Sequence, residues 1–263
     1  MNGLGTMWRA VRPPLAVSGI LFGQMVHAIR RPDLPYFPDQ DPSGTFGHPD
    51  LPPLRITLLG DSVVTAPGCD PLDACWARRT AIHLSERFHI QLISVAEGGS
   101  RVADVVDGQI ENALSTEPDL VYVAVGGNDV MRGTPLATFE RAYSELIGRL
   151  HHEVELIACS GVGDLGTIPR LPAIVRGVLR VRGRSFDHGI ARVAAAYEGV
   201  MKSVTWGPGY TPFEYDISTF SGDQFHASAS GHALFAEYGS IPVTEKLLAR
   251  FNSARQGRAG SSS

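Results

Sequence analysis

Five short apolar runs, separated by segments with helical periodicity, restrict the fold of this chain more than any other feature of its sequence. The apolar residues in these runs are nearly continuous, which is typical of strands buried on both faces of a parallel sheet. The predicted strands are residues 55–59, 90–95, 119–125, 154–159 and 200–205. The predicted helices are residues 74–88, 102–114, 135–151, 187–198 and 230–251. This alternation predicts a three-layer α/β/α domain around a central parallel sheet.

The size and charge of the chain agree with such a domain and exclude one class of partner. The 263 residues are 43% hydrophobic and 19% charged, which is the balance of a globular protein rather than a disordered one. Lys and Arg number 23 against 27 for Asp and Glu, so the formal net charge is −4. Because no excess of positive charge would attract a polyanion, we expect no nucleic-acid partner. The sequence leaves the oligomeric state open.

The segments on either side of the predicted domain, residues 54–252, differ from it in composition. Residues 32–53 are rich in Pro, Asp and Gly and are predicted to form an extended linker, and the polar residues 253–263 a flexible tail. Residues 1–31 hold an apolar stretch of about 15 residues with arginines on both sides, whereas a spanning helix needs about 20. Either this segment lies at a membrane interface, which predicts peripheral membrane contact, or it packs on the domain as a helix. A cytoplasmic or membrane-associated location is favoured, with export left open.

A serine and a histidine stand where catalytic groups are found in α/β domains. Ser62 follows the first predicted strand in the sequence Gly-Asp-Ser, at the sheet edge where such domains bind ligands. A serine hydroxyl needs a base to take its proton, and a histidine oriented by an aspartate commonly serves. Asp223 and His226 are three residues apart in a loop before a predicted helix start. His232 falls inside that helix and is expected to be structural.

Two further segments at strand ends offer hydrogen-bond donors to an oxyanion. Asn128, in the sequence Gly-Gly-Asn-Asp after the third predicted strand, has a side-chain amide that can donate. Gly99, in the sequence Glu-Gly-Gly after the second, has a backbone N–H that a substrate could approach closely, because glycine has no side chain. Three strand ends and one late loop therefore supply a nucleophile, two donors and a base.

Taken together, these four segments resemble the conserved blocks of the SGNH (GDSL-type) hydrolase superfamily, over roughly residues 54 to 250. The resemblance implies a flavodoxin-like sheet of about five parallel strands and hydrolysis of acyl esters without a metal or an organic cofactor. It makes Ser62 the nucleophile, His226 the base and Asp223 its orienting partner. Ser62 N–H, Gly99 N–H and the Asn128 amide would then form the oxyanion hole.

The chain departs from this family pattern near the second block. Many members have an asparagine and a glycine where this chain has Ser94 and Ala96, so the donating glycine could be Gly98 instead of Gly99. Gly99 is favoured because the residues after it match the usual start of the next helix. Asp61 is expected to support the turn and to have no catalytic role.

Three functions fit these residues. The first is a serine esterase or lipase that cleaves small-molecule or lipid carboxylic esters through an acyl-enzyme. The second is an O-acyltransferase, because the same triad can pass the acyl group to an alcohol other than water. The third is a non-catalytic ligand-binding domain that keeps the pocket.

Other features are secondary to this hypothesis. Cys69 and Cys75 are close enough in sequence to form a disulfide in an oxidising compartment, and free thiols are the alternative. His151, His152 and Glu153 are expected to face solvent at a helix end, not to bind a metal. Residues 169–185 interleave arginines with aliphatic side chains. This stretch is expected to be a solvated surface helix, and the alternative is a lid or a lipid-facing element.

Overall fold

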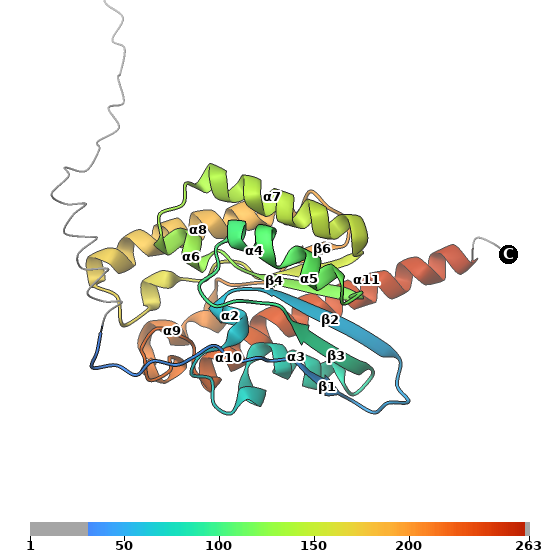
Figure 1. Cartoon of the computed structure of the whole chain (residues 1–263), viewed down its shortest axis with the longest axis horizontal. Coiled ribbons are helices and arrows are strands. Elements are labelled where there is room, and N and C mark those ends of the chain that lie inside the picture. The colour runs from blue at the N-terminus through green and yellow to red at the C-terminus, as the bar shows by residue number, and fades with distance from the viewer. Residues whose placement is uncertain (1–30, 261–263) are drawn as a thin grey trace, which may run out of the picture.

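The computed structural model describes residues 31–260, which form a three-layer α/β fold with a six-stranded sheet between two layers of helices (Figure 1). The strand order is β1-β3-β2-β4-β5-β6. Strands β2 to β6 are parallel to their neighbours, and β1 pairs antiparallel with β3 at one edge. The strands are β1 Gly44–Phe46, β2 Pro53–Gly60, β3 His89–Ser94, β4 Leu120–Ala124, β5 Leu156–Cys159 and β6 Val200–Lys202.

The helices divide between the two faces of the sheet (Figure 1). Helices α4, α5, α7 and α8 share one hydrophobic core with the sheet, and α3 and α11 share the other. The helices are α2 Ser62–Thr65, α3 Trp76–Leu84, α4 Val102–Gly108, α5 Ile110–Leu114, α6 Gly127–Met131, α7 Leu136–Glu153, α8 Ala173–Ala194, α9 Pro212–Tyr215, α10 Ala229–Phe235 and α11 Ile241–Gly260. Short 3-10 turns lie at Leu72–Ala74, Leu165–Thr167, Pro208–Tyr210 and Ile217–Thr219, and a π-helical turn, Ala236–Ser240, joins α10 to α11.

The near-continuous apolar runs are explained by burial on both sides of the sheet. In β4, Val121 and Val123 pack into the core shared with α7 and α8, while Leu120 and Tyr122 pack into the opposite core. Every residue of this strand is buried. A strand with two buried faces has no polar side to alternate with its apolar one, so the sequence shows a run instead of a period of two.

The observed elements correct several predicted boundaries. One strand more than predicted is present: β1 comes from the segment predicted to be a linker. Its three paired residues are too few to give an apolar pattern. The helix predicted over residues 187–198 is the end of the longer α8, which also includes most of the arginine-rich stretch. Helix α11 continues to Gly260, into the segment predicted to be a flexible tail.

The expectation of membrane contact rests on a segment that the structure does not describe. The apolar segment before residue 31 lies outside the described residues. Within residues 31–260 no helix is both long and apolar enough to cross a bilayer.

Cys69 and Cys75 are both buried and unbridged, and burial raises the pKa of the Cys69 thiol to about 12. Both cysteines are therefore protonated thiols inside the core.

Candidate active site

The turn after β2 fixes the position of Ser62. Gly60 has a φ of +148°, and a Cβ at this position would lie 2.0 Å from the carbonyl oxygen of Ala124 on the neighbouring strand, so only glycine fits. Asp61 caps the short helix α2, since its Oδ1 accepts a hydrogen bond from Val63 N at 3.0 Å. Ser62 is the first residue of that helix and lines a cavity. Neither its N–H nor its hydroxyl has a hydrogen-bond partner within residues 31–260.

Asp223 and His226 form a tightly bonded pair in the loop before α10. Asp223 Oδ2 lies 2.7 Å from His226 Nδ1, and its Oδ1 accepts hydrogen bonds from Ser221 Oγ, Phe225 N and His226 N at 2.7, 2.9 and 3.0 Å. Burial acts to raise the pKa of the Asp223 carboxyl, but the hydrogen bonds from His226 and Ser221 outweigh it and hold this pKa well below its usual range. The carboxylate is therefore ionised, and it leaves Nε2 as the His226 nitrogen available for proton exchange.

Ser62 and His226 line the same cavity, although they are 164 positions apart in the chain. No hydrogen bond joins their side chains in the part of the chain that the structure describes. Hydrogen bonds between catalytic groups are often long without substrate and tighten when it binds. The structure thus brings the predicted serine and histidine to one cavity, with the aspartate directly behind the histidine.

The amide of Asn128 faces the same region but is already occupied. Its Nδ2 donates to Asp61 Oδ2 at 3.2 Å and to the carbonyl oxygen of Ser100 at 3.1 Å. Asp61 is almost completely buried, and burial raises the pKa of its carboxyl to about 6. The aspartate that was expected only to support a turn therefore also holds the candidate oxyanion donor. The sequence Gly60-Asp61-Ser62 gave no signal of that second contact.

The structure separates the two candidate glycines of the second block. Gly98 N donates to Asp39 Oδ2 at 3.2 Å, whereas Gly99 N has no acceptor among the described residues. Gly99 also has a φ of +79°, in the left-handed region that favours glycine. Gly99 itself is not among the residues that line the cavity of Ser62 and Asn128. An unoccupied N–H favours Gly99 as the donor over Gly98.

The segment predicted to be a linker fastens these loops together. Asp39 Oδ1 accepts a 2.5 Å hydrogen bond from Thr65 Oγ1, at the end of the Ser62 helix, while its Oδ2 binds Gly98 N. Gln40 N donates to the Thr65 carbonyl at 2.9 Å, and Gln40 Nε2 donates to the carbonyls of Ala66 and Cys69. One carboxylate thus joins the serine helix to the glycine loop. Composition alone identified this segment as polar and did not reveal these contacts.

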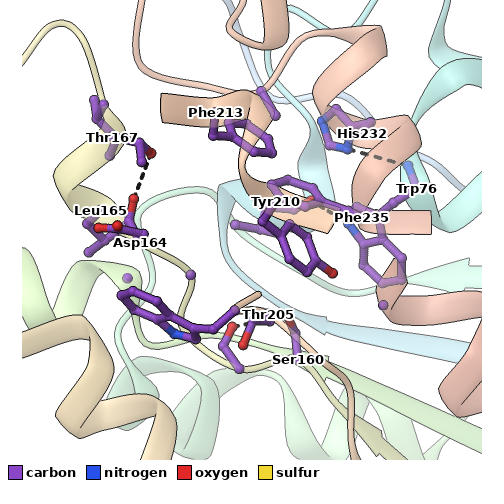
Figure 2. A pocket seen from close by; sticks show the side chains of 18 of the residues that line it. Trp76, Ser160, Asp164, Leu165, Thr167, Thr205, Tyr210, Phe213, His232 and Phe235 are labelled. Atoms are coloured by element: carbon purple, nitrogen blue, oxygen red, sulfur yellow. Dashed lines mark hydrogen bonds between the residues drawn. The ribbon is translucent and has the colours of Figure 1, made fainter. Parts of the chain in front are cut away.

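Several aromatic side chains line the cavity, among them Trp76, Tyr210, Phe213 and Phe235 (Figure 2). The cavity has a volume of about 230 Å³, and Ser160 and Thr205 supply polar groups at one side. His232 also lines it, with Nδ1 accepting from Trp76 N at 3.4 Å, as Figure 2 shows. Burial lowers the pKa of His232 to about 3, so this histidine is neutral. The aromatic residues of the wall are Trp76, Tyr122, Trp206, Tyr210, Phe213, Phe220, Phe225 and Phe235.

The structure shows no metal-binding arrangement in residues 31–260, where no three His, Cys, Asp or Glu side chains are grouped to hold an ion. His152 Nδ1 lies 2.7 Å from Glu153 Oε1, and His151 Nε2 lies 2.8 Å from the carbonyl oxygen of Glu198. Both histidines are therefore engaged in local contacts at the end of α7, away from the cavity.

Comparison with known proteins gives consistent matches. The model of the GDSL-like Lipase/Acylhydrolase family matches residues 58–234. The GDSL-like esterase Rv1075c of Mycobacterium tuberculosis is 23% identical over 213 residues, which cover 76% of this chain and 64% of that protein. This chain therefore spans less than two thirds of that relative's length.

Solved structures share the fold at low sequence identity. TesA is 18% identical, with a TM-score of 0.61 over 73% of this chain and 99% of TesA. A catalytic mutant of Axe2, an acetylxylan esterase from Geobacillus stearothermophilus, is 16% identical, with a TM-score of 0.54 over 72% of this chain and 93% of Axe2. At these identities the similarity concerns the fold.

Proposed function

The chain belongs to the GDSL-like lipase/acylhydrolase family, and on that premise we propose that it is a serine esterase that cleaves carboxylic esters through an acyl-enzyme. The observation that supports this most strongly is the Asp223–His226 pair, 2.7 Å apart, on the cavity that Ser62 also lines. Charge-assisted bonding of one imidazole nitrogen directs the other toward proton transfer. The esterase names of the relatives agree with this assignment.

In the proposed acylation step, Ser62 Oγ attacks the ester carbonyl carbon while His226 Nε2 takes the hydroxyl proton. Asp223 holds the imidazole through Nδ1 and stabilises its positive charge. The tetrahedral intermediate collapses when the bond to the alcohol oxygen breaks, and His226 returns the proton to that oxygen. The alcohol leaves, and the acyl group remains as an ester on Ser62.

In the proposed deacylation step, water replaces the departed alcohol. His226 removes a proton from the water as it attacks the acyl carbonyl, and then returns that proton to Ser62 Oγ. The carboxylic acid leaves, and the free serine is restored. An acceptor alcohol in place of water would give acyl transfer, so the identity of the product decides between the first two functions predicted from the sequence.

Three donors are proposed to stabilise the oxyanion in both steps: the backbone N–H groups of Ser62 and Gly99 and the amide of Asn128. The first two have no acceptor within residues 31–260. Asn128 must exchange one of its contacts, at 3.1 and 3.2 Å, for the substrate oxygen. Such donors contribute most when they are fixed before the charge develops.

The cavity favours uncharged esters with short or medium acyl groups. Its volume of about 230 Å³ is below the range of about 300–1,000 Å³ that is typical of sites for drug-sized ligands. Its walls are mainly apolar and include several aromatic side chains, which favours apolar groups over charged ones.

A panel of p-nitrophenyl esters of increasing acyl length tests the proposal on the wild type, Ser62→Ala and His226→Ala. We expect turnover by the wild type, best with short or medium chains, and loss of turnover by at least about a thousandfold in both variants. Equal turnover by wild type and Ser62→Ala would contradict the proposal that Ser62 is the nucleophile. No turnover by correctly folded wild type would favour the non-catalytic alternative.

A further inference from the structure

The outer face of α8 exposes an apolar stripe. Ile174, Val178 and Val181 are 66%, 49% and 69% exposed, although each is a large aliphatic residue. Their spacing of four and three residues places them on one side of the helix. Val175, Leu179 and Phe186 of the same helix are buried against the core, so α8 is anchored by its opposite face. The exposed stripe is therefore additional to the apolar surface that folding requires.

The helix that carries this stripe is rich in arginine. Helix α8 has five arginines, Arg176, Arg180, Arg182, Arg184 and Arg192, and a single acidic residue, Asp187. Asp187 is buried and paired with Lys202 Nζ at 2.8 Å, so its charge is not presented on the surface. Within residues 31–260, no ion pair involves Arg176, Arg182 or Arg184. Arg180 is paired with two carboxylates, and Arg182 donates to two backbone carbonyl oxygens. Among the described residues, Arg176 and Arg184 therefore supply the unpaired positive charge of this helix, although the whole chain has a formal charge of −4.

Two arginines of the same helix contact residues that line the cavity. Arg180 Nε lies 2.7 Å from Asp164 Oδ2, and its Nη2 lies 3.6 Å from Glu214 Oε1. The guanidinium of Arg184 lies over the Trp206 ring, 5.4 Å from its centroid. These three contacted residues, Asp164, Glu214 and Trp206, all line the cavity. A surface that bound this face of α8 would therefore lie close to the cavity wall.

A second exposed apolar group lies at the C-terminal end of α9. Tyr215 and Ile217 are 75% and 58% exposed, directly after Glu214, which faces Arg180. In Figure 1, α8 and α9 lie at the same end of the molecule. Apolar side chains from two elements that are separate in sequence are thus exposed beside one cavity, an arrangement that typically marks an interaction site.

The described chain begins at this end of the molecule. Arg31 is paired with Asp33, and the charge of Arg170, just before α8, helps to lower the pKa of the Asp33 carboxyl. The 30 residues before Arg31 include the apolar run of residues 14–22, with Arg9 and Arg12 before it and Arg30 after it. An apolar run with basic neighbours has the composition of segments that bind lipid interfaces.

We propose that the exposed face of α8 binds an anionic lipid surface. Ile174, Val178 and Val181 would enter the boundary between headgroups and acyl chains, and the arginines beside them would contact headgroup phosphates. This arrangement places residues that line the cavity near the lipid, which would favour ester substrates that are dissolved in the lipid or released from it. The proposal concerns a binding surface and does not depend on the catalytic assignment.

Vesicle cosedimentation of the full chain tests the proposal, with phosphatidylcholine vesicles compared with mixtures of phosphatidylcholine and phosphatidylglycerol. We expect binding to the mixed vesicles that weakens in high salt, because screening reduces attraction between the arginines and the phosphates. Replacing the stripe, Ile174→Ser/Val178→Ser/Val181→Ser, should weaken this binding on the order of tenfold or more. Hydrolysis of a soluble p-nitrophenyl ester should be unchanged in this variant, which also shows that it is folded.

Two control variants separate this surface from the opposite helical layer and from the proposed nucleophile. Ile82→Ser, on α3 in the opposite layer, removes an exposed isoleucine of 44% exposure and should bind vesicles as the wild type does. Ser62→Ala should also bind normally, so a failure of the catalytic proposal would be distinguishable. Undiminished vesicle binding by the triple variant would overturn the proposal and assign the binding to another part of the chain. Absence of wild-type binding, or a dimer by light scattering that the triple variant abolishes, would overturn it as well.

Discussion

Asn128 Nδ2 donates a hydrogen bond to Asp61 Oδ2 across 3.2 Å, linking the turn after β4 to the turn that presents Ser62. Asp61 also caps the serine helix through Val63 N. One buried carboxylate therefore fixes both the helix of the proposed nucleophile and the amide of a proposed oxyanion donor. This double contact couples the two turns geometrically, and it makes both residues suitable for mutational tests.

Removal of the Asn128 amide should slow the chemical step. We expect Asn128→Ala to lower kcat by about 10²–10³, with a much smaller change in KM, because the donor contributes mainly when the oxyanion has formed. Steady-state kinetics on a p-nitrophenyl ester measures both constants. A fully active Asn128→Ala enzyme would remove this residue from the oxyanion hole.

Neutralising Asp61 should change how stability depends on pH. In the folded chain the pKa of Asp61 is raised from 3.8 to about 6. Below pH 4 the carboxyl is protonated in both the folded and the unfolded state, so its titration does not change the free energy of unfolding there. Between pH 4 and 6 the unfolded chain ionises first, and the free energy of unfolding falls by about 3 kcal/mol, a loss that is complete above pH 6.

The variant Asp61→Asn lacks this titration. Relative to the wild type, its free energy of unfolding should therefore rise by up to about 3 kcal/mol between pH 4 and 7. Urea denaturation of both proteins at these two pH values measures the difference. A difference between variant and wild type that is the same at both pH values would contradict the raised pKa.

The hydrogen bonds of Asp39 predict that a residue outside the family match affects turnover. Asp39→Ala frees Thr65 Oγ1 and Gly98 N, and so loosens the serine helix relative to the glycine loop. We expect kcat to fall about tenfold with little change in KM, since small displacements of positioned groups are costly. Asp39→Asn keeps one acceptor oxygen and should be intermediate.

A matched control is Asp50→Ala in the same segment, where the side chain is 89% exposed and paired only with His48 in the described structure. Its kinetics should equal those of the wild type. If Asp39→Ala lowered the melting temperature but left kcat unchanged, its contacts would stabilise the fold without positioning the site.

Breaking the buried ion pair of Lys202 and Asp187 should strongly lower the stability of the fold. The atoms Nζ and Oδ1 are 2.8 Å apart, and the side chains are only 14% and 10% exposed. Lys202→Met leaves a buried unpaired carboxylate and should lower the free energy of unfolding by about 3–5 kcal/mol. Adding Asp187→Asn removes that charge and should recover much of the loss. Urea denaturation at neutral pH measures the free energy of unfolding of both variants. Equal losses in the single and the double variant would contradict the prediction.

The sequence predicted the parts of the fold that depend on local patterns. Strands β2, β4 and β5 were recognisable because burial on both faces makes their apolar residues nearly continuous. Strands β3 and β6 are only partly buried, although their apolar runs were also predicted as strands. The edge strand Gly44–Phe46 was missed because three residues held by pairing with β3 create no pattern of their own. The sequence predicted helical structure on both sides of residue 186 but not that the two parts form the single helix α8, because internal glycines and exposed aliphatic residues interrupt the expected periodicity.

The site could be predicted as a set of residues, but its connections could not. Gly-Asp-Ser after a strand and Asp-x-x-His before a helix are chemically distinctive, and the structure places Ser62 and His226 on one cavity. The contacts of Asp39 with Thr65 and Gly98 join positions 26 and 59 residues away in sequence. Such contacts depend on the tertiary path of an irregular segment, which composition does not encode.

The central claim is that Ser62 is the activated nucleophile, and labelling with a fluorophosphonate followed by peptide mass spectrometry tests it most directly. We expect one adduct per chain on the peptide that contains Ser62, no adduct in Ser62→Ala, and labelling slowed by orders of magnitude in His226→Ala. An unlabelled but folded wild type, or an adduct on a different residue that persists in Ser62→Ala, would contradict it.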